Sequence, residues 1–146
     1  MNKIKSMLIS SVATFLTFFL LVSAAQADVA VVVGAGSGVS SISARDAKKI
    51  FLGKTKKLPD GSDAAPVYQP DASATHAAFR DKVLRKSASQ LKSYWSKKVF
   101  SGKGTPPKEM ADDAAVKAYV SSTAGGIGYI DAAAVDGSVK VLLTVK

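Results

Sequence analysis

The fold is indicated most clearly by residues Pro66–His76, which read PVYQPDASATH. The first four residues of this segment predict a short β-strand, and Ser73 is placed to cap a helix that follows. A strand that leads into a helix is the repeating unit of proteins in which helices cover a sheet. This segment therefore favours a mixed α/β protein.

Apolar runs and helix-capping side chains alternate along the rest of the sequence. The apolar runs are short enough to predict buried strands, and the capping residues precede apolar side chains at helical spacing. The pattern predicts an α/β fold with a sheet covered by helices and with parallel strand pairs. The further predicted strands are Val29–Val33, Ile127–Ile130 and Val139–Val145, and the further predicted helix caps are Ser43, Ser87 and Asp112.

The first 27 residues have the pattern of a signal peptide. Lys3 and Lys5 provide a positive start, an apolar run follows, and Ala25-Gln26-Ala27 is a small-x-small cleavage pattern. The alternative is an uncleaved membrane anchor, because residues 6–25 carry no charge and ~20 residues span a bilayer. We expect cleavage after Ala27, which leaves residues 28–146 as one exported, periplasmic domain.

Composition excludes several functional classes. The 146 residues contain no cysteine and one histidine, which excludes disulfides, thiolate metal sites, a cysteine nucleophile and multi-histidine metal centres. The glycine-rich loop at residues 34–38 lacks the last glycine of a dinucleotide fingerprint and the Gly-Lys-Ser/Thr of a P-loop. We therefore predict a binding protein that is not an enzyme and uses no metal or cofactor.

Basic side chains exceed acidic ones, and they are clustered. Without the first 27 residues the chain has 18 Lys and Arg against 11 Asp and Glu. Such a field attracts anions, acidic polymers or anionic surfaces, although charge runs on helices also serve solubility. Nucleic acid is not an expected partner of an exported protein. The clusters are Lys48, Lys49, Lys54, Lys56 and Lys57, and then Arg80, Lys82, Arg85, Lys86, Lys92, Lys97, Lys98 and Lys103.

A candidate anion site lies in the segment Gln69–His76, where the predicted strand ends and the predicted helix begins. Unpaired backbone N–H groups and the positive end of the helix dipole gather at a helix start. The hydroxyls of Ser73 and Thr75 add donors there, so a tetrahedral oxyanion could be bound without a metal. The alternative is that Ser73 only caps the helix, which contributes ~1 kcal/mol to stability.

Several further motifs resemble those of the phosphate-binding proteins of ABC importers. They extend from Ser40 to Val145, and the resemblance is closest to short, stand-alone phosphate-transporter substrate-binding-like proteins. It implies a single periplasmic-binding-protein-like (type II) lobe that holds phosphate or a related oxyanion. The motifs are Ile50–Lys54, Pro59–Gly61, Asp71-x-Ser73-x-Thr75-x-x-x-Phe79, Tyr94-Trp95, Phe100-x-Gly102, Pro106-Pro107 and Gly126–Tyr129.

The resemblance also implies roles for residues of the candidate site. In the family, a Ser-Gly-Thr stretch at a helix start donates to phosphate oxygens. Ser73 and Thr75 stand at those positions, and Ala74 replaces the glycine. Asp71 matches an acidic residue that, in the family, accepts a proton from protonated phosphate.

The sequence departs from the family in one residue and in length. Gln69 stands where the family has an arginine, which removes a planar, bidentate donor; His76 and Arg80 are the nearby candidates to replace it. Full-length relatives close two lobes around the ligand, whereas 119 residues form about one lobe. A second copy of the chain or another envelope protein would then supply the missing wall.

Two functional hypotheses follow. The first is a periplasmic solute-binding module for phosphate or a related oxyanion, linked to an ABC importer. The second is an interaction module that has kept the lobe and binds an acidic envelope partner or an anionic surface through its basic face. Phosphate binding distinguishes the two.

Overall fold

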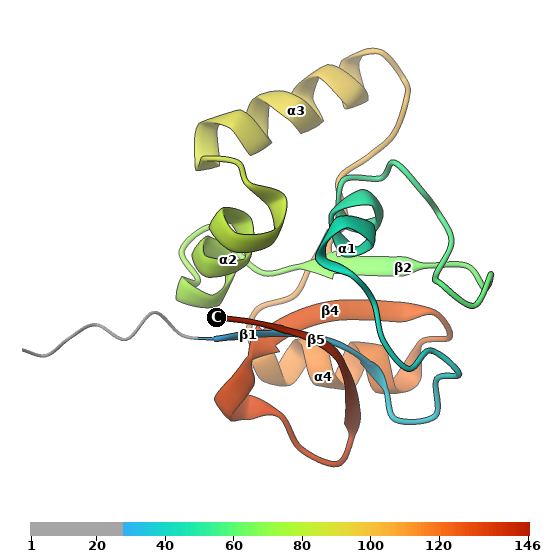
Figure 1. Cartoon of the computed structure of the whole chain (residues 1–146). Coiled ribbons are helices and arrows are strands. Elements are labelled where there is room, and N and C mark those ends of the chain that lie inside the picture. The colour runs from blue at the N-terminus through green and yellow to red at the C-terminus, as the bar shows by residue number, and fades with distance from the viewer. Residues whose placement is uncertain (1–27) are drawn as a thin grey trace, which may run out of the picture.

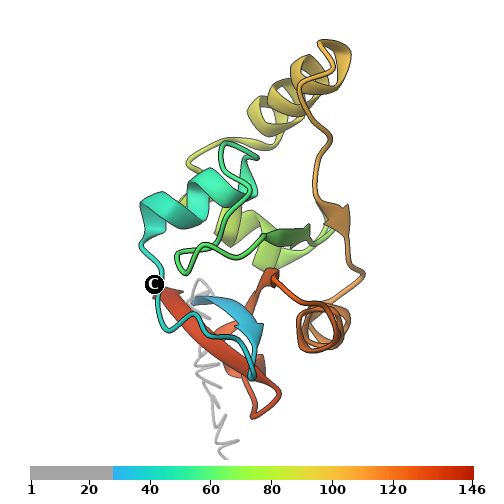
Figure 2. The same ribbon diagram turned by 90° about the vertical axis from the view of Figure 1, so that its right-hand side faces the viewer.

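The computed structural model describes residues 28–146, and the predicted signal peptide lies outside this range. One five-stranded sheet, with strand order β3-β2-β4-β1-β5, forms the centre. Helices α1, α2 and α3 lie on one side of the sheet and α4 lies on the other (Figures 1 and 2). The elements are β1 Val29–Gly34, α1 Ala44–Phe51, β2 Ala65–Tyr68, α2 Ala74–Phe79, the π-helix η1 Arg80–Leu84, α3 Ala88–Phe100, β3 Lys108–Glu109, α4 Asp113–Ser122, β4 Gly126–Asp131, the 3-10 helix η2 Ala132–Ala134 and β5 Val139–Val145.

The sheet is mixed. Strand β2 pairs in parallel with β3 and β4, which confirms the prediction of parallel pairs, whereas β1 is antiparallel to β4 and β5. The apolar run of β1 is buried on both faces of the sheet, as expected for a central strand. Strand β3 was not predicted, because its two residues are charged and exposed.

All four predicted capping residues begin a helix. The side chains of Ser43, Ser73, Ser87 and Asp112 each accept a hydrogen bond from the backbone N–H three residues further on. Only α3 has the complete capping box, in which the Gln90 side chain also accepts from the Ser87 N–H. Local capping chemistry therefore fixes where each helix leaves its loop.

A separate hydrophobic cluster covers each face of the sheet. Val31 and Tyr129 face α1 and α2, while their neighbours Val32 and Ile130 face α4. The α4 side is packed so closely that a Cβ at Gly128 would lie 2.5 Å from a methyl carbon of Val116. The glycines of β4 thus allow the sheet and α4 to pack closely.

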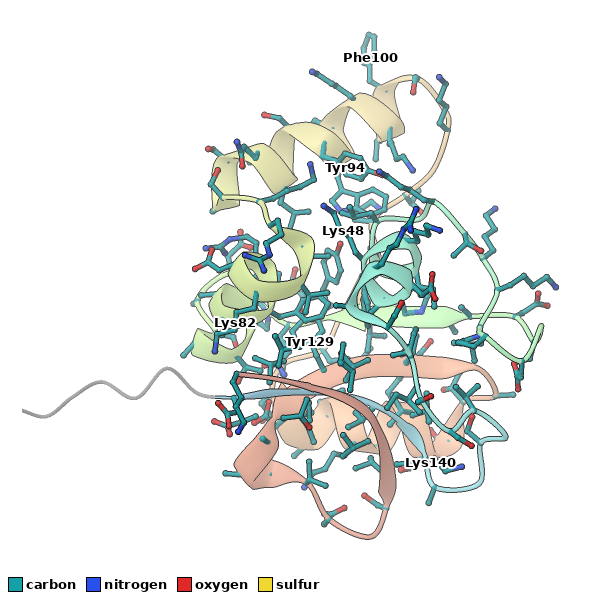
Figure 3. All side chains as sticks on the ribbon, in the orientation of Figure 1. Lys48, Lys82, Tyr94, Phe100, Tyr129 and Lys140 are labelled. Atoms are coloured by element: carbon teal, nitrogen blue, oxygen red, sulfur yellow. The ribbon has the colours of Figure 1, made fainter. Side chains whose placement is uncertain are left out.

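Helix α3 contacts the rest of the protein mainly through its first part. Leu91 and Trp95 are buried, and Tyr94 is half-buried against them. Val99 stands at the helical spacing that would continue this apolar stripe, but it is 51% exposed, and Phe100 is 95% exposed. Figure 3 shows Phe100 pointing away from the body of the protein. Among residues 28–146, no helix is long and apolar enough to cross a membrane.

Candidate anion-binding site

The candidate site lies at the carboxyl end of β2, where the chain turns into α2. Strands β2 and β4 run in parallel, so Tyr68 and Asp131 end at the same edge of the sheet. Helix α2 passes directly into η1, because Phe79 and Arg80 both keep helical dihedral angles. The segment predicted from the sequence is therefore a strand-to-helix turn at a sheet edge, a common place for ligands in α/β proteins.

The side chain of Gln69 is engaged by the protein itself. Its Nε2 donates to Asp113 Oδ1 at 2.7 Å and to the Tyr129 carbonyl at 2.9 Å, while its Oε1 accepts from the Ser73 hydroxyl at 2.8 Å. Gln69 is 3% exposed. It therefore joins β2, β4, α2 and α4, and no donor of its side chain remains for a ligand.

The hydroxyl of Ser73 is also committed. It donates to Gln69 and accepts from the His76 N–H at 3.2 Å, so it acts as the helix cap. In contrast, within residues 28–146 no hydrogen bond is formed by the N–H groups of Ala74 and Thr75, the first two residues of α2. Ala74 is exposed, and Thr75 is buried. Within residues 28–146, the helix start thus keeps these two backbone N–H groups, together with the Thr75 hydroxyl, as donors that form no hydrogen bond in the protein.

A buried hydrogen-bond chain passes beneath this helix start. The Tyr129 hydroxyl accepts from the Gln69 N–H at 2.8 Å and lies 2.5 Å from Nδ1 of His76. The Tyr129 hydroxyl has one proton, and this proton has a hydrogen-bond acceptor only if it is donated to Nδ1 of His76. Nδ1 is then unprotonated, so the neutral imidazole carries its proton on Nε2. Burial lowers the pKa of His76; the charge of Asp71 opposes this shift, and that of Arg80 adds to it. His76 is therefore neutral at pH 7.

Two charged side chains flank the site. The Asp71 carboxylate is 88% exposed, and its Oδ1 lies 3.3 Å from His76 Nε2, which nevertheless has no aligned hydrogen-bond partner within residues 28–146. In the same part of the chain, the Nε of Arg80 is likewise buried without a hydrogen-bond partner. The positive charge of Arg80 would attract a nearby anion. The Asp71 carboxylate would repel the anion unless the two groups share a proton.

The arrangement suits binding better than catalysis. The hydroxyl that lies beside the His76 ring is that of Tyr129, and burial raises the pKa of this hydroxyl above the usual value. Burial therefore makes the Tyr129 hydroxyl harder to ionise. Ser73 donates to an amide oxygen and not to His76, so no serine nucleophile is activated here. The unpaired N–H groups of a helix start can bind an oxyanion without further chemistry.

Sequence reasoning placed Gln69, Asp71, Ser73, Ala74, Thr75 and His76 together, and the structure brings them to one turn. It missed Tyr129 and Asp113, which hold Gln69 from positions more than 40 residues away. A weak signal existed for Tyr129, because a tyrosine between glycines and isoleucines on a buried strand needs a partner for its hydroxyl.

Neither a protein-family model nor a curated protein sequence matches this chain, but solved structures do. A Clostridium perfringens phosphate ABC transporter substrate-binding protein, solved with bound phosphate, superposes with a TM-score of 0.63 and 21% identity. An ABC-type phosphate transport receptor from Vibrio cholerae gives 0.62 and 16%. PstS from Borrelia burgdorferi gives 0.57 and 13%. The chain has the periplasmic-binding-protein fold.

The likeness covers one part of these larger proteins. In each case it includes 80% of this chain but only 45–47% of the neighbour, so the chain spans about half of their length. This confirms the predicted fold class, a periplasmic-binding-protein-like lobe with a sheet covered by helices. One of these neighbours is described as a substrate-binding protein and another as a transport receptor.

Proposed function

We propose that this periplasmic-binding-protein-like lobe binds inorganic phosphate or a related oxyanion at the start of α2. The observation that carries the proposal is the pair of unpaired N–H groups at Ala74 and Thr75, at an edge where the fold allows a ligand to sit. One structural neighbour is described as having phosphate bound, which supports the choice of ligand.

The surrounding charges favour a protonated oxyanion. The helix dipole and Arg80 attract negative charge, while the exposed carboxylate of Asp71 repels it unless a proton lies between the two groups. The roles of the side chains differ from those that the resemblance implied. Ser73 and Gln69 shape the turn, and the donors are the backbone N–H groups of α2 and the Thr75 hydroxyl.

The proposal includes export and a partner. Residues 1–27 direct the chain to the periplasm, where the anion is available, and an ABC importer receives it. Since one lobe leaves the anion half exposed, and an exposed hydrogen bond contributes only ~1 kcal/mol, a second copy of the chain or another envelope protein completes the site.

The test removes one backbone donor without disturbing the helix. Ala74 is the first residue of α2, a position that accepts proline, and Ser73 has the extended angles (φ −72°, ψ 128°) that a residue before proline requires. Ala74→Pro should weaken phosphate binding about 5-fold, because a hydrogen bond that is exposed to water contributes ~1 kcal/mol. Calorimetry with inorganic phosphate on refolded, ligand-free protein measures this.

The matched control is Ala44→Pro. Ala44 is the exposed first residue of α1, and Ser43 before it has similar extended angles (φ −76°, ψ 154°). This variant should bind phosphate as the unaltered chain does. The proposal fails if both variants lose binding equally, or if the folded, unaltered protein gives no heat with millimolar phosphate.

A further inference from the structure

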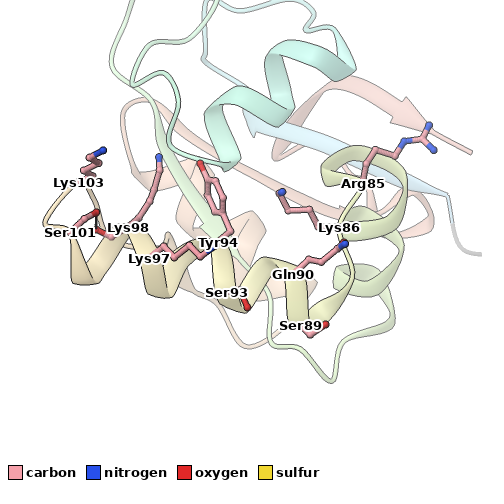
Figure 4. A pocket seen from close by; sticks show the side chains of 10 residues that line it. All are labelled: Arg85, Lys86, Ser89, Gln90, Ser93, Tyr94, Lys97, Lys98, Ser101 and Lys103. Carbon is pink, nitrogen blue, oxygen red and sulfur yellow. Dashed lines mark hydrogen bonds between the residues drawn. The ribbon is translucent and has the colours of Figure 1, made fainter.

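A second region with anion-binding chemistry lies on α3, away from the α2 start. An open hollow of about 720 Å³ runs along one flank of this helix, and five of its ten lining residues are cationic. Figure 4 shows Tyr94 and Lys98 rising from α3, and Arg85 and Lys86 from the turn before it, on the side that faces α1. The cationic residues are Arg85, Lys86, Lys97, Lys98 and Lys103, which we call the α3 cations.

The charge of this hollow is not compensated by the protein. Residues 82–108 contain no Asp or Glu. The ion pairs formed within residues 28–146 involve Lys49, Lys57, His76 and Lys117, none of which lines the hollow. The counterions of the α3 cations must therefore come from solution, and a ligand with several negative charges gains by displacing them.

Specific contacts hold part of the cluster in place. The Lys98 ammonium donates to the Leu52 carbonyl at 3.1 Å, and the Tyr94 hydroxyl donates to the same oxygen at 2.5 Å. The ammonium groups of Lys86 and Lys98 each lie 5.1 Å from the centre of the Tyr94 ring. Two like charges are thereby kept on one aromatic ring, although they repel each other.

Arg85 adds a conformational cost to the same cluster. It is the only residue other than glycine with positive φ among residues 28–146, at φ 54° and ψ 42° between η1 and α3. Glycine is the usual residue in this conformation, which costs other residues ~1 kcal/mol. An arginine here sacrifices stability and brings a fifth charge to the hollow.

We propose that the hollow binds a flexible linear polyanion with closely spaced phosphate groups. One water takes up ~30 Å³ of liquid, so the volume accommodates several linked tetrahedral groups. A membrane surface is less suited, because the hollow is concave and the exposed Phe100, which would insert into lipid, does not line it. No residue of Gln69–His76 lines the hollow, so the two sites are independent.

The test compares two double variants of equal charge. Lys97→Gln with Lys103→Gln removes two exposed α3 cations, and Lys54→Gln with Lys92→Gln removes two exposed lysines outside the hollow. Binding of fluorescein-labelled linear polyphosphate is followed by anisotropy. The first variant should bind about 10-fold more weakly, and the control less than about 3-fold. The slope of log K against log salt should fall by about 1.4 in the first variant, at ~0.7 per lost contact.

A single variant separates binding from folding. Arg85→Gly removes one cation and relieves the positive φ, so it should weaken polyphosphate binding without lowering Tm. Ala74→Pro should leave polyphosphate binding unchanged, which distinguishes this site from the phosphate site. The inference is wrong if the control pair weakens binding as much as the hollow pair, or if phosphatidylglycerol vesicles bind while polyphosphate does not.

Discussion

The start of α2 and the flank of α3 both present donors to an anion, but they are built in opposite ways. At α2, the side chains of Gln69 and Tyr129 are buried, that of Ser73 is half-buried, and all three form hydrogen bonds within the protein, so backbone N–H groups are among the donors left over. On α3, the donors are long cationic side chains without a carboxylate partner within residues 28–146. The first site depends on geometry and the second on charge.

This difference determines how each region contributes to stability. A buried, fully paired polar network is costly to break, because the group left behind has no water to bond with. Exposed side chains can be changed with effects within about 0.5 kcal/mol. Substitutions of the buried, hydrogen-bonded side chains beside α2 should therefore lower the free energy of unfolding, and substitutions on the outer part of α3 should not.

The largest effect is expected from Tyr129→Phe. Loss of this hydroxyl leaves both the Gln69 N–H and His76 Nδ1 unpaired in the core. Each buried unpaired group costs ~1–3 kcal/mol, so with two such groups the free energy of unfolding should fall by ~2–6 kcal/mol. Urea denaturation followed by Trp95 fluorescence measures it.

Tyr94→Phe is the matched control, because it removes one hydroxyl from a half-buried tyrosine whose acceptor, the Leu52 carbonyl, keeps Lys98 as a donor. We expect a loss of about 1 kcal/mol or less. Equal losses in the two variants would contradict the distinction between a committed core network and the α3 surface.

The same comparison shows what the sequence alone could predict. Helix starts were predictable at Ser43, Ser73, Ser87 and Asp112, because capping acts over three residues and is visible in a short window. The role of Gln69 could not be predicted in this way. Its hydrogen-bond partners Asp113 and Tyr129 are 44 and 60 residues away in the sequence, and they come close to Gln69 only when the chain folds and β2 pairs with β4.

The α3 flank was predictable in charge but not in shape. The run of lysines from Lys82 to Lys103 indicated an anion-attracting surface, yet a charge run on a helix is compatible with a flat, solvated face. The hollow forms because Arg85 turns the chain and because Tyr94 and Lys98 reach the end of α1. Both features depend on tertiary contacts.

An intermediate effect is expected from pH, again at the α2 site. His76 has a lowered pKa in the folded protein, mainly because it is buried. As pH falls below about 6.5, the unfolded chain takes up a proton that the folded protein resists. Stability is therefore full above about pH 6.5 and declines on acidification, by at most about 1.4 kcal/mol per pH unit.

Because His76 is the only histidine, the decline between pH 6.5 and 5 can be assigned to it. His76→Asn keeps an acceptor for the Tyr129 hydroxyl and removes the titrating group. This variant should be less stable at pH 7 but should show a flatter profile in denaturant titrations across that range. An unchanged slope would exclude His76 as the titrating group.

The smallest effect is expected from Phe100→Ser at the end of α3. A buried phenylalanine contributes several kcal/mol, but this ring is 95% exposed, and its neighbour Val99 is 51% exposed. The free energy of unfolding should therefore change by less than about 0.5 kcal/mol in urea. Polyphosphate binding should also be unchanged, because Phe100 does not line the hollow. If the free energy of unfolding fell by more than about 1 kcal/mol, the Phe100 ring would have to pack on the protein in solution. The end of α3 would then contribute to stability, and the contrast between the α3 surface and the buried network at α2 would be wrong.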